Sequence, residues 1–226
     1  MTDIGRSLAL LQYGDSFFPS GSVSFSWGIE ALSEIGIVKS SEDVVSFLKG
    51  QLHARWSQFD RAVLTAAHGA KGDMSAVSEI DHQVEIQTTS LEVRTSSCRL
   101  GRALLSTFSR LGSEEAAAYL RLIGERGAYG HASPMQGWLW AKAGLSLEEA
   151  VALSAHTFCT SLLSAAVRLG CLTHLQAQTA LEELRSEVCS IVETPVCGMD
   201  EISSCAFESE LAIVGHARQN IRMFAN

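Results

Sequence analysis

The chain has 226 residues, enough for one large domain or two small ones, and 46% of them are hydrophobic. This composition predicts a packed core and excludes general disorder. A net charge of −8, with no basic run and no aromatic residues interleaved with basic ones, argues against a nucleic-acid partner.

The expected cellular compartment is inferred from three features that the sequence lacks: a membrane span, a signal peptide and paired cysteines. No run reaches the roughly 18 apolar residues that cross a bilayer, and the first residues, MTDIGRSLALLQYGD, lack the basic leader and cleavage site of a signal peptide. The cysteines form no CxxC pair: Cys98, Cys159, Cys171, Cys189, Cys197 and Cys205. Free buried thiols are expected in a reducing compartment, so we expect a cytoplasmic protein without membrane contacts.

Apolar residues recur mostly at steps of three and four, which predicts helices. Proline, the strongest helix breaker, occurs only as Pro19, Pro134 and Pro195. The expected helices are 4–14, 24–36, 41–68, 74–82, 88–111, 114–126, 131–144, 147–169, 173–192 and 201–215. Strand signals are poor, and no long linker or tandem repeat divides the chain. The sequence predicts an all-α fold, a single-domain helical bundle of roughly ten helices over residues 1–226.

Three of these helices carry clear apolar series. The series on 41–68 is Val44, Leu48, Leu52, Trp56, Phe59 and Val63, all expected on one helix face. Similar series run from Leu147 and from Leu181. Ser146 lies three residues before Glu149 and predicts a capping box at a helix start. The segment 193–200, ETPVCGMD, is the expected flexible loop because proline and glycine interrupt helix there.

Signatures of known catalytic sites are missing from the sequence. It has no phosphate-binding GxxxxGK[ST] loop, no GxSxG nucleophile elbow, no HExxH and no zinc-deaminase motif. The seven histidines are scattered. Glu30, Glu34, Glu42 and Asp43 are expected at helix starts or on exposed faces, so no acid stands out as a general base. An interaction protein without an active site is favoured.

One metal-site hypothesis has to be weighed. Cys189, Cys197 and Cys205 are evenly spaced and His216 follows, and thiolate with imidazole suits nickel or zinc. Closed structural zinc sites take their ligands in tight pairs, and this spacing does not. We therefore expect ordinary thiols and no intrinsic metal site, with a metal-binding protein that uses these cysteines kept as an alternative.

The stretch FPSGSVSFSWG, residues 18–28, holds no charge, although it is rich in serine, glycine and aromatic residues. Serine and glycine let a backbone approach a partner closely, and aromatic residues are frequent interface anchors. Alternatively, the aromatics dock this segment on its own bundle. Core packing is favoured for Phe25 and Trp27, whereas for residues 19–22 partner contact and packing stay equally open.

Five stretches, in order, resemble the urease accessory protein UreF family. They are FFPSGSVSFSWGIEAL (17–32), SLEVRTSSCRLGRALL (90–105), GHASPMQGWLWAKAGLSLEEAV (130–151), SLLSAAVRLGCL (161–172) and GHARQNIRMF (215–224). The chain departs from the family pattern at Val23, where an aromatic is frequent, and at His174, where glutamine is common. It also departs at Asn220 and Ile221, where the family usually has Tyr-Ser.

The resemblance implies an all-helical, non-catalytic dimer. It implies a scaffold that bridges UreD (also called UreH) and the GTPase UreG, modulates the GTPase and helps deliver nickel to apo-urease. Nickel would then be handled by the complex. The partner-binding residues that it implies are Pro19, Ser20, Gly21, Ser22, Phe25, Ser26, Gly28, Glu30, His131, His216, Arg222 and Phe224. The tail 216–226 is expected to become ordered when UreD binds.

Three other classes stay open. An enzyme could use Cys189 or Cys205 as a nucleophile, a storage protein could bind several metal ions, and a helical adaptor could serve a system unrelated to urease. Rapid alkylation of a thiol, nickel binding without partners, and the identity of co-purifying proteins would distinguish them.

Overall fold

The computed structural model describes residues 2–20 and 27–204, and every regular element in these ranges is helical. The elements are α1 (Asp3–Gly14), α2 (Ile29–Glu34), α3 (Ser41–Gln51), the π-helix η2 (Leu52–Asp60), α4 (Arg61–Gly69), α5 (Met74–Gln87), α6 (Leu91–Arg110), α7 (Glu114–Gly124), α8 (Ala132–Lys142), α9 (Leu147–Arg168) and α10 (His174–Glu193). The predicted all-α bundle of about ten helices is confirmed.

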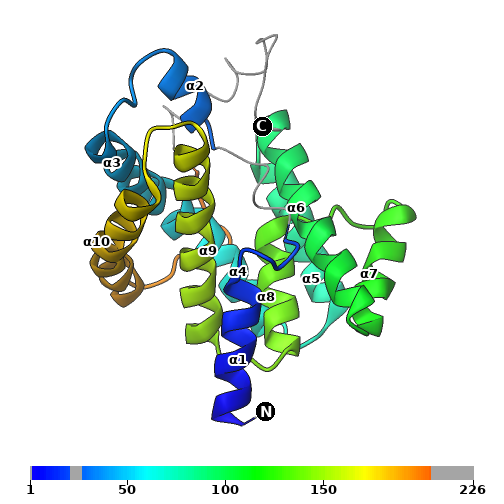
Figure 1. Ribbon diagram of the computed structural model, residues 1–226. Coiled ribbons are helices and arrows are strands. Elements are labelled where there is room, and N and C mark those ends of the chain that lie inside the picture. The colour runs from blue at the N-terminus through cyan, green and yellow to red at the C-terminus, as the bar shows by residue number, and fades with distance from the viewer. Residues whose placement is uncertain (1, 21–26, 205–226) are drawn as a thin grey trace.

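The helices pack in two groups on either side of α9. In one group α4 packs along α8, α8 along α6, and α6 along α7. In the other, α3 and α10 pack on each other and on α9, while α1 lies against α9 near its start. Figure 1 shows α6 and α7 on the right and α2, α3 and α10 on the left, with α9 between them.

Most residues of the predicted apolar series lie in the core, whereas Leu147 is 38% exposed and Leu169, Leu181 and Val188 are partly buried. All six residues of the series from Val44 to Val63 are buried, as are Phe158 and Leu162 of α9. The capping box of Ser146 and Glu149 is also present. Among the described residues, α9 alone has the length and hydropathy to cross a membrane, and 61% of its apolar window is buried inside the bundle. This helix therefore packs as a core helix of the bundle.

The prediction of one regular helix over 41–68 misses a change of winding. Residues Leu52–Asp60 form a π-helix, which bonds each residue to the fifth along the chain. Five residues correspond to about 140° of rotation on an α-helix, because each residue turns about 100°. The wider turn brings Arg55 and Asp60 to one side, and Phe59 and Val63 join a second, smaller core cluster with Val84.

Two predicted helices, 24–36 and 201–215, differ more strongly from the observed structure. In place of 24–36, α2 begins at Ile29, because Trp27 and Gly28 have positive φ of 53° and 84°. In place of a helix from 201, residues 201–204 are a turn and irregular chain, where Ile202 enters the second cluster. The remainder of that prediction, 205–215, lies outside the described residues.

The predicted loop after α10 is irregular in structure, and a buried arginine holds its start. Arg61, 2% exposed, donates to the carbonyls of Ile191, Thr194 and Pro195 at 2.7, 3.3 and 3.0 Å. These carbonyls end α10, where unpaired acceptors and the helix dipole favour a cation. Residues 195–204 then pass back over η2, where the Ser203 amide and the Cys197 thiol both lie 3.4 Å from the Gln58 carbonyl.

Candidate functional site

The best-organised polar site is built around the Asp81 carboxylate on α5. Its two oxygens accept the backbone N–H groups of Tyr129, Gly130 and His131 at 2.8, 2.7 and 2.8 Å, and the Tyr119 hydroxyl at 3.1 Å. The side chain is fully buried. These amides open α8, and a helix N-terminus favours a negative charge. Asp81 therefore fixes the turn that carries His131.

His131 meets an acid and a thiol from two other helices. Its Nε2 lies 2.9 Å from Glu85 Oε2, and Cys98 Sγ lies 3.7 Å from both ring nitrogens. Burial lowers the pKa of His131, against the opposing effects of Asp81 and Glu85. A neutral imidazole is therefore expected at pH 7, donating from Nε2 to Glu85.

The thiols at this site and in the core are predicted to be poor nucleophiles. Burial raises the pKa values of Cys98 and Cys159 to about 12. Their thiolate fraction at pH 7.5 is then roughly three orders of magnitude below that of an ordinary thiol of pKa about 8.5. In the native chain, iodoacetamide should label exposed Cys189 well before either one, as mass spectrometry of tryptic peptides would show. Rapid labelling of Cys98 would contradict this expectation, whereas the enzyme alternative requires Cys189 or Cys205 to react faster than an ordinary free thiol.

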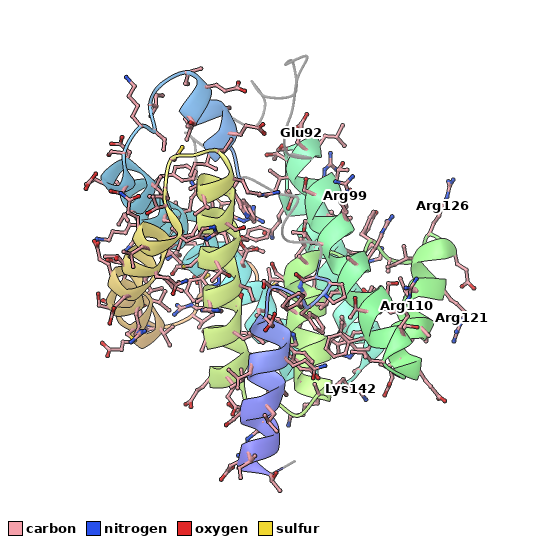
Figure 2. All side chains as sticks on the ribbon, in the orientation of Figure 1. Glu92, Arg99, Arg110, Arg121, Arg126 and Lys142 are labelled. Carbon is pink, nitrogen blue, oxygen red and sulfur yellow. The ribbon has the colours of Figure 1, made fainter. Side chains whose placement is uncertain are left out.

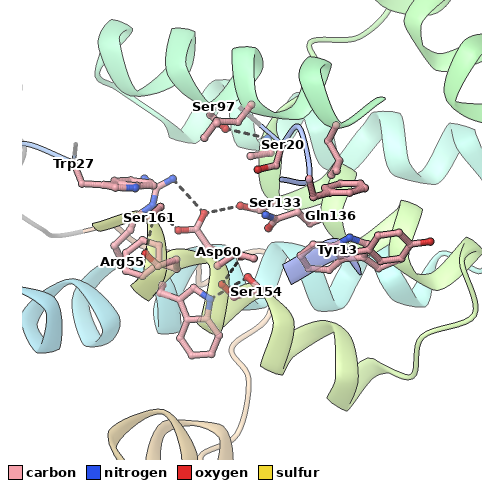
Figure 3. A pocket seen from close by; sticks show the side chains of 18 of the residues that line it. Tyr13, Ser20, Trp27, Arg55, Asp60, Ser97, Ser133, Gln136, Ser154 and Ser161 are labelled. Carbon is pink, nitrogen blue, oxygen red and sulfur yellow. Dashed lines mark hydrogen bonds and ion pairs between the residues drawn. The ribbon is translucent and has the colours of Figure 1, made fainter. Parts of the chain in front are cut away.

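A second site lies beneath the N-terminal signature. Figure 3 shows this cavity, about 80 Å³, with Tyr13 and Trp27 at its wall and a polar row across it. In that row Arg55 Nε donates to Asp60 at 3.0 Å, and Ser133 Oγ donates to Asp60 at 2.6 Å. The Arg55 and Asp60 side chains are 6% and 11% exposed. Their pairing offsets the cost of burying both charges.

Arg55 also connects two distant parts of the chain. Its guanidinium carbon lies 5.6 Å from the Trp27 ring centroid and 4.3 Å from that of Phe59. Its Nη1 donates to Ser204 Oγ at 3.1 Å. Trp27 directly follows residues 21–26, and Ser204 directly precedes residues 205–226. The residue that follows segment 21–26 and the residue that precedes segment 205–226 therefore both contact the Arg55 side chain.

The aromatics of the signature have divided roles. Phe18 packs against Tyr13 and Phe108 at centroid distances of 5.2 and 6.0 Å, and Trp27 lies 5.3 Å from the Phe158 ring. Core packing of Trp27 is therefore confirmed. Phe17, in contrast, is 93% exposed.

Exposed apolar groups border a surface groove between the end of α1 and α6. Phe17, Phe18 and Pro19 line one side, and Arg110 and exposed Leu111 line the other. The hydroxyl of Thr107 in the groove lies 3.0 Å from both the Pro19 carbonyl and the Ala103 carbonyl of its own helix, so its one proton is shared between the signature and α6. We call this surface the Phe17 groove.

Four exposed arginines lie on α6, on α7 and just after α7, and one of them, Arg110, lines the Phe17 groove together with Asp15. Arg99 and Arg110 on α6, Arg121 on α7 and Arg126 after it are exposed and project outward in Figure 2. Within residues 2–20 and 27–204, none of these four has an ion pair. An exposed apolar patch with charged residues at its rim is typical of a protein-binding surface.

The described partner-binding candidates fall into two groups. Pro19 is exposed and Ser20 is half-buried beside the cavity, whereas Gly28, Glu30 and His131 are buried within the chain. The other candidates lie outside the described residues: Gly21, Ser22, Phe25, Ser26, His216, Arg222 and Phe224. Partner contact stays a prediction for all of them.

Two acids were misjudged or missed from the sequence. Glu30 was expected at a helix start or on an exposed face. It does lie in the first turn of α2, but it is 3% exposed, and its charge raises the pKa of half-buried Arg168 against the larger lowering by burial. Asp81 was not singled out, although it stands between Val77 and Val84 in a buried stripe. An acid at an apolar position of a helical series is the signal that could have identified it.

The alternative metal site from evenly spaced cysteines is not assembled in the part of the chain described. Cys189 is exposed, Cys197 Sγ lies 3.4 Å from the Gln58 carbonyl, and neither joins a group of three candidate ligands there. Cys205 and His216 lie outside the described residues. The described metal-ligand cluster is instead Glu85, Cys98 and His131.

Comparison with known proteins identifies the family. Residues 38–185 match the family model described as UreF. A protein of Trichodesmium erythraeum named urease accessory protein UreF is 32% identical over 229 residues, covering 100% of this chain and 99% of that protein. Proteins of the same name from Yersinia enterocolitica and Trichormus variabilis are each 26% identical, over 97% and 96% of this chain and 97% and 94% of their own lengths. With more than half of its length matched by the family model, this chain belongs to the UreF family of urease accessory proteins.

Proposed function

We propose that the chain is a non-catalytic cytoplasmic scaffold of urease maturation. It bridges UreD (UreH) and the GTPase UreG during nickel delivery to apo-urease and works as a homodimer. The observation that carries this proposal is the Phe17 groove, where a 93% exposed phenylalanine lies beside exposed Leu111 and Arg110. Such a surface is suited to burial against another protein rather than to chemistry on a small molecule.

UreD is the proposed partner for the signature and the tail together. The resemblance implies that the tail 216–226 contacts UreD. Arg55 contacts both Trp27, which follows residues 21–26, and Ser204, which precedes the segment 205–226 that includes the tail. One partner could therefore engage both. Arg110 lines the groove and has no ion pair within residues 2–20 and 27–204, which favours an acidic group on that partner.

Buried signature residues would act as supports. Gly28 permits the left-handed turn that starts α2, and Glu30 is buried in the first turn of that helix, so both would support the helix start without facing solvent. In the same way, His131 would hold the α8 turn. Direct contact is assigned to Pro19 and Ser20 and to the predicted residues outside the described ranges.

Regulation of UreG would follow from differential affinity. A partner shifts a conformational equilibrium only if it binds one state better than the other. We expect the chain, with UreD, to bind one nucleotide state of UreG at least about fivefold better than the other, as coupling of about 1 kcal/mol implies. Titration of UreG loaded with GDP or a non-hydrolysable GTP analogue measures this ratio, and equal affinities would remove the switching role.

Replacing Phe17 by aspartate should weaken UreD binding about tenfold or more, because it places a charge at an exposed aromatic side chain that the proposed complex would bury. Leu175→Asp is the matched control, since Leu175 is 78% exposed at the start of α10 and does not line the groove; Figure 1 shows α10 on the left and α6 on the right. Pull-down of UreD with each variant, followed by titration, provides the measurement. Equal binding by both variants would show that the groove is not the UreD contact.

A further inference from the structure

We propose that Glu85, Cys98 and His131 form a binding site for one borderline divalent cation, of which Zn²⁺ and Ni²⁺ are the candidates. The proposal goes beyond the scaffold role and does not rest on it. Three helical elements bring the residues together: α5, α6 and the start of α8. Carboxylate, thiolate and imidazole are the ligand types that such ions accept.

The three ligand atoms lie close together, and tetrahedral coordination requires the thiol to turn toward Nε2. One ligand atom from each residue lies within 4.8 Å of the other two. Bonds of about 2.3 Å to sulfur and 2.1 Å to nitrogen place two tetrahedral ligands about 3.6 Å apart. Cys98 Sγ lies 3.7 Å from both His131 ring nitrogens, beside the imidazole, so the Cys98 side chain or the ring has to rotate before both can bind one ion at Nε2. Glu85 Oε2 lies 2.9 Å from the same nitrogen and would have to move by only a few tenths of an ångström.

The surroundings would hold the ligands in place. Arg94 Nη1 donates to Glu85 Oε1 at 3.0 Å, which leaves Oε2 directed toward the imidazole. Asp81 fixes the backbone of His131. Outer hydrogen bonds of this kind orient metal ligands in proteins. The Glu85 side chain is 20% exposed, whereas that of His131 is fully buried, so an ion would enter from the Glu85 side.

Charge is compatible with a cation once the thiol loses its proton. Three negative groups, Asp81, Glu85 and the Cys98 thiolate, then face two positive groups, Arg94 and Arg102. The site therefore has a net negative charge. Binding would convert the Cys98 thiol to a thiolate and release its proton to solvent. The His131 proton would move from Nε2 to Nδ1, which changes no charge. One proton is therefore released for each ion bound.

The test uses the purified full chain, stripped with a chelator and titrated separately with Zn²⁺, Ni²⁺ and Co²⁺. We expect one ion per chain, one proton released in weak buffer, and for Co²⁺ the intense visible absorption of tetrahedral coordination with a thiolate band. Cys98→Ser should weaken binding about tenfold or more and remove the thiolate band. Cys189→Ser, an exposed cysteine on α10, should leave both unchanged.

Two results of these titrations would reject the proposed metal site. If the wild-type chain binds no ion at micromolar concentration, or if Cys98→Ser binds as tightly as Cys189→Ser, the proposed site is wrong. His131→Gln, checked for native circular dichroism, tests the nitrogen ligand independently of sulfur. The ion with the lower dissociation constant is the preferred metal. Loss of UreD binding by Phe17→Asp tests only the scaffold proposal and has no bearing on the metal site.

Discussion

Replacing Gly101 by alanine is expected to destabilise the bundle by about 3 kcal/mol, the upper end of the usual cost of overpacking. A Cβ added at this residue of α6 would lie 2.1 Å from the Gly130 carbonyl oxygen and 2.7 Å from the carbonyl carbon and oxygen of His131. These are backbone atoms, and Asp81 holds their turn from the other side. The strain cannot be relieved by a rotamer change, so α6 and α8 must separate.

Gly50 provides the matched control for this substitution. It is an exposed residue of α3, and nothing lies within 4 Å of an added Cβ. Gly50→Ala should therefore stabilise the protein by about 0.5–1 kcal/mol, the difference in helix propensity. Urea unfolding followed by circular dichroism measures both variants. If Gly101→Ala unfolds at the same urea concentration as wild type, the close contact of α6 with the α8 turn is not rigid.

Gly137 on α8 likewise permits a close backbone contact, here between α8 and α4. An added Cβ there would lie 2.2 Å from the Leu64 carbonyl oxygen, where α8 crosses α4. A glycine in an apolar helix lowers helix propensity, so its presence has to be explained by packing. The two glycines let α8 approach α4 on one side and α6 on the other.

Much of the fold was predictable because it depends on local periodicity. The spacing of Val44, Leu48 and Leu52 identifies a buried helical face without knowledge of what covers it. The winding of η2 was not predictable in this way. Its π-turn places Arg55 beside Asp60, and that pairing is stabilised by Ser133 from another helix, which no local pattern reveals.

The candidate sites were less predictable because they combine residues far apart in the chain. His131 was named from a motif, but its neighbours Glu85 and Cys98 lie 46 and 33 residues away along the sequence. Helical spacing says which face a residue occupies, not which helix it meets. The exposure of Phe17 beside the packed Phe18 also depends on the path of the chain after α1, which composition leaves open.

Replacing Asp81 by asparagine is expected to cost about 3 kcal/mol of unfolding free energy, the upper range for a buried donor left without its acceptor. Oδ2 accepts three donors and Oδ1 accepts the His131 amide. An asparagine amide would turn its own NH₂ group toward at least one of these N–H groups, whichever way it is oriented. The negative charge at the start of α8 would also be lost.

Asp73→Asn on the same helix isolates this effect from the change of residue type. Asp73 is exposed and caps α5 by accepting from Ser75 and Ala76, and asparagine caps a helix as well as aspartate does. Urea unfolding should therefore leave Asp73→Asn near wild type while Asp81→Asn unfolds earlier. Equal stability of the two variants would mean that the α8 turn holds itself without Asp81. The expected difference would instead make Asp81 the residue that sets both the Gly101 contact and the position of His131.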